Sequence, residues 1–364
     1  MKRLVEHGLA TGVERHFSEG VIRWQKQHGR HELPWQGTRD AYRIWLSEIM
    51  LQQTQVATVI PYYARFLARF PDIAALANAP VEEVMALWSG LGYYTRARNL
   101  HRCAQIVVAE HDGRFPSDVE RLASLPGIGR STAAAIAAFA YGTRAAILDG
   151  NVKRVFCRAF GIDGFPGSVA VERRLWEMAA GLLPATDIES YTQGLMDLGA
   201  TICTRSHPRC TACPLALQCV AHASHRTAEL PARKPRKALP EKSTVMLVVE
   251  YRGAILMEQR PPSGIWGGLL SLPELGRLLP SVPTEVGKKV LLSALAEFGE
   301  VHAIEALGDF VHVFTHYRLR VTPLRIRLSR RFPQTSPSSY QWVPKKKLAS
   351  AALPAPVRKL LDGR

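Results

Sequence analysis

The stretch Trp45–Thr54 reads WLSEIMLQQT, and it lies inside a longer run, Ala41–Phe70, whose apolar residues recur at helical spacing. The run holds a single carboxylate, Glu48, which a helix would place beside Ile44 and Leu51. Burial against apolar side chains raises the pKa of a carboxyl group and keeps it protonated near neutral pH. A surface glutamate is the alternative, but this helix carries few charges. We therefore predict that Glu48 donates a proton.

Three uncharged polar residues follow this helix directly. Gln52, Gln53 and Thr54 offer hydrogen-bond donors and acceptors without net charge, which suits the reading of neutral base edges. The loop His31–Gln36 before the helix presents Trp35, which is either a core residue or part of the lining of the same pocket.

The composition favours a two-domain protein that binds nucleic acid. The chain has 364 residues, of which 47% are hydrophobic, and a formal net charge of +16. This length suits two domains, and the positive charge favours a polyanionic partner. No segment reads as a membrane span, and the N-terminus lacks the apolar region of a signal peptide. We expect a protein without membrane association that is cytoplasmic and nucleoid-associated in a bacterium, or nuclear in a eukaryote.

Two glycine-containing turns are candidate DNA contacts. In LPGIGRSTA (125–133), Gly127 and Gly129 predict a tight turn with positive φ angles, followed by a helix of small residues whose N-terminal N–H groups can hold a phosphate. This is the helix-hairpin-helix signature, and an ordinary turn between helices is the weaker alternative. In GLGYYTRARNL (90–100), Tyr93 and Arg96 suit a wedge into a duplex with a phosphate contact beside it. A core tyrosine pair with solvated arginines is equally compatible with the second stretch.

A second carboxylate, Asp149, stands in LDGNVKRV (148–155) at the start of a predicted helix. Aspartate is a preferred N-cap residue, and we expect capping to depress its pKa and keep it ionised. Two carboxyl groups whose pKa values are driven apart form the acid and stabiliser pair used at glycosidic bonds. We therefore predict that Asp149 is the partner of Glu48.

Four cysteines cluster in the sequence with the spacing Cys203-x6-Cys210-x2-Cys213-x5-Cys219. Disulfides are rare in reducing compartments, and four thiols within so short a segment favour a metal site or an iron–sulfur cluster. Zinc ribbons usually show two Cys-x-x-Cys pairs, and this segment has one. The spacing therefore favours a 4Fe-4S cluster over zinc.

The pattern of apolar and polar residues changes in the last third of the sequence. Residues 226–242 read as a basic linker, which is either a solvated tether or a segment that lies along phosphates. From residue 243 the sequence predicts two strands around the turn Tyr251–Gly253, a helix near Lys288–Phe298, further alternating strands and a last helix near Pro356–Leu361. This pattern predicts an α+β domain.

Taken in order, these motifs resemble the helix-hairpin-helix DNA glycosylases, and within them the MutY-type adenine DNA glycosylases, over nearly the whole chain. The resemblance implies a mainly α N-terminal helix-hairpin-helix domain with an iron–sulfur cluster loop (1–225), the linker (226–242) and an α+β Nudix-like C-terminal domain (243–364). It also implies the activity: removal of adenine from double-stranded DNA at A:8-oxoguanine or A:G mispairs. We expect a monomer.

The resemblance implies roles for individual residues. Glu48 corresponds to the general acid that protonates adenine N7, Asp149 to the carboxylate that stabilises the cationic sugar, and Asn151 to an active-site asparagine. Ser131 stands where related bifunctional enzymes carry a lysine that forms a Schiff base, and serine cannot form one. The resemblance also places Gln53, Thr54 and Tyr93 near 8-oxoguanine. It places Trp35 and Gln193 near the extruded adenine.

The C-terminal part resembles a Nudix-like domain that has lost its metal site. Only Glu297 remains of the Nudix carboxylates in Leu292–Gly299, LSALAEFG. The resemblance therefore implies recognition without pyrophosphatase activity. Family members read 8-oxoguanine with a Phe-Ser-His loop, where this chain has Phe314, Thr315 and His316. The added methyl group of threonine is the main departure from the family pattern.

Three other functions are weaker interpretations of the same residues. A bifunctional glycosylase and lyase for damaged pyrimidines is opposed by Ser131. A non-catalytic DNA-binding or redox-sensing protein is opposed by the presence of both Glu48 and Asp149. A nucleotide pyrophosphatase is opposed by the missing Nudix carboxylates.

Overall fold

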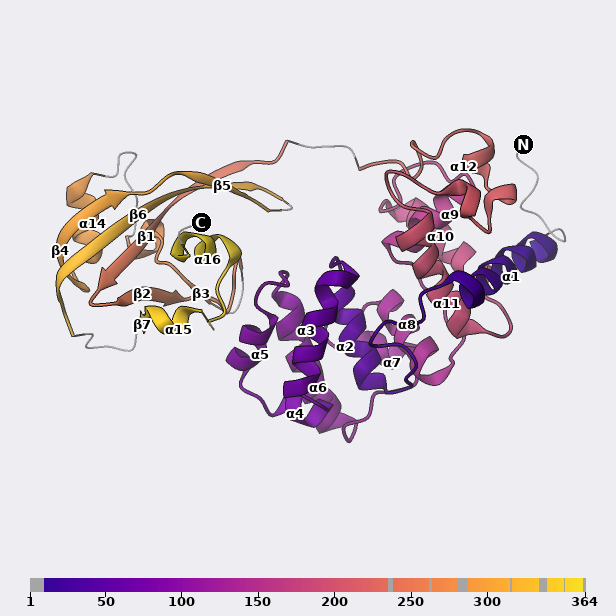
Figure 1. Cartoon of the computed structure of the whole chain (residues 1–364), viewed down its shortest axis with the longest axis horizontal. Coiled ribbons are helices and arrows are strands. Elements are labelled where there is room, and N and C mark those ends of the chain that lie inside the picture. Colours follow the sequence, from indigo (N-terminus) through magenta and orange to yellow (C-terminus); the bar gives the residue numbers. More distant parts are fainter. Residues whose placement is uncertain are drawn as a thin grey trace. The chain divides into compact units, whose positions relative to one another are not determined.

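The computed structural model describes residues 10–234, 238–261, 264–279, 287–314, 316–333, 339–349 and 351–362 (Figure 1). The described residues form two compact units, one within 1–78 and 99–236 and the other within 79–98 and 237–364. None of the described helices combines the length and the apolarity that a membrane crossing requires.

The first unit is helical. Its helices are α1 (Ala10–His28), α2 (Ala41–Leu51), α3 (Val56–Arg69), α4 (Ile73–Ala77), α6 (Thr95–Glu110), α7 (Val119–Ser124), α8 (Arg130–Tyr141), α9 (Gly150–Ala159), α10 (Val169–Gly181), α11 (Ile188–Asp197) and α12 (Val220–Ala223). One π-helical turn, Leu198–Ile202, extends α11, and two short 3₁₀ turns, Cys210–Ala212 and Ala216–Gln218, precede α12.

Helix α2 begins at a side-chain cap and ends at a left-handed turn. The Asp40 carboxylate accepts a hydrogen bond from the backbone N–H of Tyr42 at 2.9 Å, which satisfies a free donor of the first turn. The helix ends at Leu51, and Gln53 in the next turn has a φ of 57°. This break places the polar residues 52–54 in a turn rather than on a helix.

Proline favours the first position of a helix, which would predict a helix start at Pro61, but α3 begins at Val56 and holds Pro61 in its interior. Proline in a helix interior lacks the N–H that would bond the carbonyl four residues earlier. The helix persists because its face of Val59, Tyr63 and Phe66 is buried, and tertiary packing outweighs the local cost.

Helix α8 is the centre of the first unit, and α2, α7 and α11 pack against it. Residues 133–138 are all buried, and their mostly alanine side chains let these neighbours approach closely. Helices α1 and α11 also pack closely against each other. A Cβ on Gly194 would lie only 2.8 Å from Cγ1 of Val21, so glycine permits this approach. This packing brings α1, α2, α8 and α11 around one cavity.

The second unit contains helix α5 (Val81–Trp88) and a mixed sheet. Its strands are β1 (Glu241–Tyr251), β2 (Ala254–Gln259), β3 (Leu270–Ser271), β4 (Gly299–Ala306), β5 (Phe310–Val313), β6 (Arg318–Arg331) and β7 (Tyr340–Pro344). Among the described residues the strand order is β3-β2-β1-β6-β4, with β5 paired to β6 and β7 to β2. Strands β1 and β6 run parallel, and the other pairs are antiparallel.

The sheet buries residues on both faces. Along β1, Met246 and Val248 enter one core, while Leu247 and Val249 enter the other, as the period of two along a strand requires. Helix α14 (Lys288–Leu295) covers the second face, and α16 (Ala355–Leu361) covers the first. The remaining helices of this unit are α13 (Leu275–Leu278) and α15 (Lys345–Leu348).

The predicted turn between the first two strands is confirmed. Arg252 has a φ of 43° and Gly253 a φ of 78°, which is the pair of left-handed residues that a two-residue hairpin prefers. The predicted fold class, a helical N-terminal part with an α+β C-terminal part, is confirmed as well.

Candidate active site

A cavity of about 560 Å³ opens between helices of the first unit, and Glu48 lies in its wall. The lining residues come from α1, the loop before α2, α2 itself, α8 and the start of α11: Gln25, Lys26, His31, Trp35, Gln36, Gly37, Thr38, Arg39, Ile44, Ser47, Glu48, Phe139, Glu189, Ser190 and Gln193. The structure therefore places Trp35, Glu48 and Gln193, which come from three separate segments, in the wall of one cavity.

Burial changes the acidity of Glu48. Its pKa is raised from 4.5 to about 8, first because the surrounding protein desolvates the carboxylate and second because of repulsion from Asp149. The raised pKa keeps the carboxyl group mostly protonated near neutral pH, and its place in the cavity wall makes it accessible to a bound group. The expected direction of the shift is confirmed.

Asp149 caps α9 as predicted, but the expected depression of its pKa is wrong. Its carboxylate accepts a hydrogen bond from the backbone N–H of Val152 at 2.8 Å. Burial raises the pKa of Asp149, and the hydrogen bonds from Val152 and Asn151 with the charges of Arg154 and Lys153 only oppose that shift. The sequence predicted the capping hydrogen bond. It did not predict the desolvation of Asp149, because that comes from helices distant along the chain.

Ser131 ties the start of α8 to the loop that carries Asp149. Its hydroxyl oxygen accepts a hydrogen bond from the backbone N–H of Leu148 at 2.9 Å. Ser131 therefore makes a contact that positions the Asp149 loop, and its side chain provides no amine for covalent chemistry.

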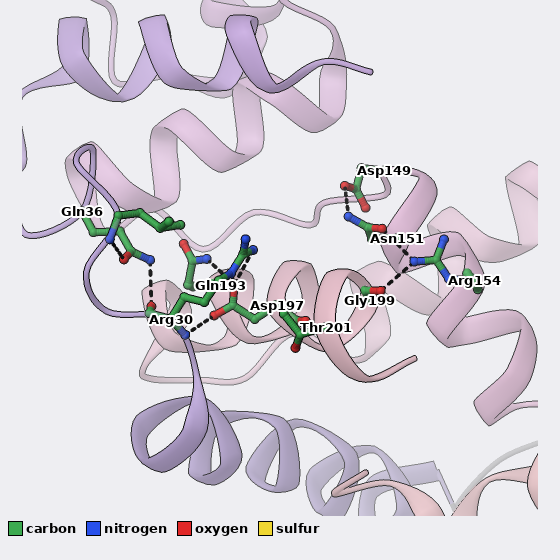
Figure 2. A network of polar contacts seen from close by, with 10 residues as sticks. Arg30, Gln36, Asp149, Asn151, Arg154, Gln193, Asp197, Gly199 and Thr201 are labelled. Carbon is green, nitrogen blue, oxygen red and sulfur yellow. Dashed lines mark hydrogen bonds and ion pairs between the residues drawn. The ribbon is translucent and has the colours of Figure 1, made fainter. Parts of the chain in front are cut away.

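A polar chain runs from Asp149 along α9 to the end of α11 (Figure 2). Asn151 Nδ2 lies 3.5 Å from Asp149 Oδ2, and Asn151 Oδ1 accepts a hydrogen bond from Arg154 Nη2 at 2.8 Å. The Arg154 guanidinium also donates to the carbonyls of Gly199 and Cys203, both at 2.7 Å. Sequence reasoning missed Arg154, although its place one turn after Asn151 on the same helix face was a usable signal.

A second polar chain supports Gln193. Its Nε2 donates to Asp197 Oδ1 at 2.8 Å, and Arg30 donates to the same carboxylate through its backbone N–H and its guanidinium (Figure 2). Gln36 Nε2 donates to the Arg30 carbonyl at 2.9 Å. Arg30 and Asp197 were also missed, and the four-residue spacing of Gln193 and Asp197 was the available signal.

Trp35 is 7% exposed and packs edge-on against Tyr63, with ring centroids 5.4 Å apart. It is therefore both a core residue and a wall of the cavity, so the two interpretations of its position do not exclude each other.

The turn after α2 lies beside the helix-hairpin-helix turn. Gln52 Nε2 is 3.4 Å from the Gly127 carbonyl and 3.4 Å from Thr132 Oγ1. Gly127 has a φ of 82°, as predicted, but Gly129 has a φ of −88° and is the extended N-cap of α8, so the expected positive φ of Gly129 is wrong. Gln52 and its neighbours thus share a surface with the proposed phosphate-binding turn.

Tyr93 and Arg96 lie against each other but differ in exposure, with the Arg96 guanidinium carbon 5.5 Å from the centre of the Tyr93 ring. Tyr93 is 47% exposed and has a φ of 49°. Arg96 is 8% exposed, and its guanidinium donates to the carbonyls of Leu91 and Gly92, both at 3.2 Å. The expected exposure of Arg96 is wrong: the side chain supports the turn that presents Tyr93, because turn carbonyls need donors.

The four clustered cysteines line one small cavity together with Arg158 and Ile202. Arg158 Nη1 lies 3.4 Å from Cys203 Sγ, and its guanidinium donates to the carbonyls of Thr204 and Leu230. All four are free thiols, and burial together with repulsion from the other three raises the pKa of Cys213 to about 12. Among the described residues no group of three or more side chains is spaced to hold a single metal ion.

In the second unit, aromatic rings gather at the loop after β5. Phe314 stacks on Tyr317 with centroids 4.6 Å apart and lies 4.5 Å from the His312 ring and 5.6 Å from Trp266. His316 lies 4.8 Å from Tyr317. Thr315 lies outside the described residues.

Family models match both the N-terminal and the C-terminal part of the chain. The model of the HhH-GPD superfamily base excision DNA repair protein matches residues 46–180, and a NUDIX domain model matches residues 244–363. The chain is 35% identical to adenine DNA glycosylase of Buchnera aphidicola subsp. Schizaphis graminum over 95% of its own length and 98% of that protein, and 34% identical to adenine DNA glycosylase of Mus musculus over 94% and 77%. A solved thermostable thymine-DNA glycosylase matches with a TM-score of 0.54 and 30% identity, over 59% of this chain and 99% of that one.

Proposed function

This chain belongs to the adenine DNA glycosylases, which are base excision DNA repair enzymes, and on that premise we propose that it removes adenine paired with 8-oxoguanine or guanine. The reaction hydrolyses the N-glycosidic bond and leaves an abasic site. The observation that carries the proposal is Glu48, a carboxyl group with a pKa of about 8 in the wall of a cavity of about 560 Å³. A cavity of this kind accommodates a base extruded from the duplex.

Glu48 supplies the proton in this proposal. Adenine is a poor leaving group until a ring nitrogen is protonated, and a carboxyl group with a pKa near the working pH transfers protons efficiently. Asp149 then stabilises the positive charge that develops on the sugar, because a desolvated carboxylate interacts strongly with a nearby cation. Water completes the reaction. Ser131 offers no amine, so we propose hydrolysis without a strong lyase step.

We propose that Cys203, Cys210, Cys213 and Cys219 hold a 4Fe-4S cluster. The four thiols line one cavity, and they lie close enough for Cys213 to interact electrostatically with the other three, as the four thiolate ligands of one cluster would. Such a cluster, when bound, crosslinks its loop through iron–thiolate bonds. The Cys203 carbonyl accepts a hydrogen bond from Arg154, so an ordered loop also orders the residues next to Asp149.

We propose further that the second unit reads the 8-oxoguanine strand with the loop that contains Phe314 and His316. The stacked rings of Phe314 and Tyr317 fix the base of this loop, and an aromatic side chain held in this way suits stacking against a base. The exposed Tyr93 is the proposed wedge at the mispair.

The proposal is tested by single-turnover excision. The purified chain is incubated with a duplex that carries one adenine opposite 8-oxoguanine, and with the same duplex carrying adenine opposite thymine. We expect alkali-labile abasic product from the mispair alone, and no borohydride-trapped covalent complex. A trapped complex would support the lyase, and absence of product from protein that binds the duplex would refute the glycosylase.

A further inference from the structure

Gln193 lines the cavity, and its side-chain amide is held by a hydrogen bond to Asp197. The two residues stand one helical turn apart on α11, so their side chains share a face. Gln193 Nε2 donates to Asp197 Oδ1 at 2.8 Å, and the amide oxygen lies on the side away from that carboxylate (Figure 2).

Asp197 is placed so that it can only accept hydrogen bonds. Its side chain is 1% exposed, and Arg30 contacts both of its oxygens: the guanidinium reaches Oδ1 at 2.7 Å and the backbone N–H reaches Oδ2 at 2.8 Å. Both carboxylate oxygens accept hydrogen bonds from Arg30, so they face Gln193 as acceptors. If the Gln193 amide rotated by half a turn, two acceptors would face each other in a buried site, which is costly.

The backbone fixes the position of Arg30. A Cβ at Gly29 would lie 2.6 Å from the Gln25 carbonyl and 3.1 Å from Asp197 Oδ2, so glycine permits this close approach. Gln36, which also lines the cavity, donates to the Arg30 carbonyl at 2.9 Å. The carboxylate is therefore held between α1 and α11 before any base enters.

We propose that Asp197, through its ion pair with Arg30, is a positioning residue that sets base specificity. It holds the Gln193 carbonyl oxygen towards the cavity, where this oxygen accepts a hydrogen bond from an exocyclic amine and repels a carbonyl oxygen at the same place. Adenine carries the amine, and hypoxanthine carries a carbonyl oxygen there on an otherwise similar ring. This inference deepens the proposed function and rests on it.

The test compares single-turnover excision rates of the full chain on two duplexes that differ in one base, adenine or hypoxanthine opposite 8-oxoguanine. In Asp197→Asn the new amide can present either an N–H or an oxygen, so Gln193 becomes free to rotate. We expect the ratio of the adenine rate to the hypoxanthine rate to fall by at least about tenfold, because a site that loses a fixed hydrogen-bond partner loses discrimination.

Thr201→Val is the matched control, because Thr201 Oγ1 donates to the backbone carbonyl of Asp197 at 2.8 Å and not to its carboxylate. We expect the wild-type ratio in this variant. If Asp197→Asn does not fold, Gln193→Leu provides the second test, since it keeps the buried ion pair and removes only the amide; its ratio should also fall.

Each outcome decides one question. Selective excision of adenine by the wild-type chain, with an unchanged ratio in the folded Asp197→Asn or in Gln193→Leu, overturns the inference alone. Excision of neither base by the wild-type chain overturns the proposed function and the inference with it. A reduced ratio in the variant, with the wild-type ratio in Thr201→Val, supports both.

Discussion

At the scale of single residues, the acidity of Glu48 links burial to chemistry. Its pKa of about 8 means that the protonated form, which donates the proton, predominates below that pH. We therefore expect the single-turnover rate to fall as the pH rises through about 8.

We also expect Glu48→Gln to lose excision by at least about a hundredfold while retaining duplex binding, because general acid catalysis contributes on this order. Comparable excision by the variant would exclude Glu48 as the acid, and duplex affinity measured in parallel serves as the control.

The same shift predicts how stability depends on pH. Between the unfolded value of 4.5 and the folded value of about 8, the folded state holds a proton that the unfolded state has released. The contribution of Glu48 to stability is therefore fully present below about 4.5 and is lost as the pH rises through about 8. Glutamine has no charge to desolvate. In urea unfolding we therefore expect the stability of Glu48→Gln relative to wild type to be greater at pH 8.5 than at pH 5 by on the order of 4 kcal/mol, since each of the roughly three pH units between 5 and the folded pKa contributes about 1.4 kcal/mol. If the difference in the free energy of unfolding between wild type and Glu48→Gln stays constant with pH, the raised pKa of Glu48 is contradicted.

At the scale of secondary structure elements, Arg154 connects the start of α9 with the segment that follows α11. It donates to Asn151, Gly199 and Cys203 at once. A lysine keeps the charge but cannot satisfy three acceptors in a fixed plane. We expect Arg154→Lys to lower the single-turnover rate by about tenfold with little change in duplex affinity, because a small misplacement of Asp149 is costly.

Arg144 offers a matched control for that substitution. Its guanidinium also donates to two backbone carbonyls, those of Leu183 and Pro184, both at 2.8 Å, and both acceptors lie in the segment before α11. We expect Arg144→Lys to keep the wild-type rate. Equal losses in the two variants would mean that Arg154 acts only on general stability.

The helix-hairpin-helix turn allows a test with two glycines. Gly127 has a φ of 82°, and a Cβ there would lie 3.0 Å from Cβ of Asn99, whereas Gly129 has an extended backbone with no atom within 4 Å of a new Cβ. We expect Gly127→Ala to lower the free energy of unfolding by roughly 1 kcal/mol and to weaken duplex binding. Gly129→Ala should leave the stability within about 0.5 kcal/mol of wild type. Urea unfolding of both variants checks this, and equal losses would contradict the difference between the two positions.

At the scale of the whole molecule, the net charge of +16 predicts how the chain meets DNA. Contacts to phosphates release counterions, so we expect the logarithm of the affinity for an undamaged duplex to fall linearly with the logarithm of the salt concentration. Fluorescence anisotropy between about 50 and about 200 mM salt measures the slope. An affinity independent of salt would show that the charge does not act through phosphates. The monomeric state remains a prediction.

The sequence by itself determined the class of fold and the order of its motifs, and it predicted that Glu48 and Asp149 lie near each other, which their electrostatic interaction supports. These depend on periodicity, on turn residues and on short motifs, which are local properties. The burial of Glu48 could also be predicted, because its apolar neighbours lie on its own helix.

Only the tertiary structure decided the features that depend on segments distant along the chain. The raised pKa of Asp149, the buried place of Arg96 and the interior position of Pro61 in α3 each reversed an expectation based on local preference. Capping, exposure and helix starts are average tendencies, and desolvation and packing by other helices can outweigh them. The contacts of Asp197 with Arg30 belong to the same class, because they join residues 167 positions apart that only the packing of α1 on α11 brings together.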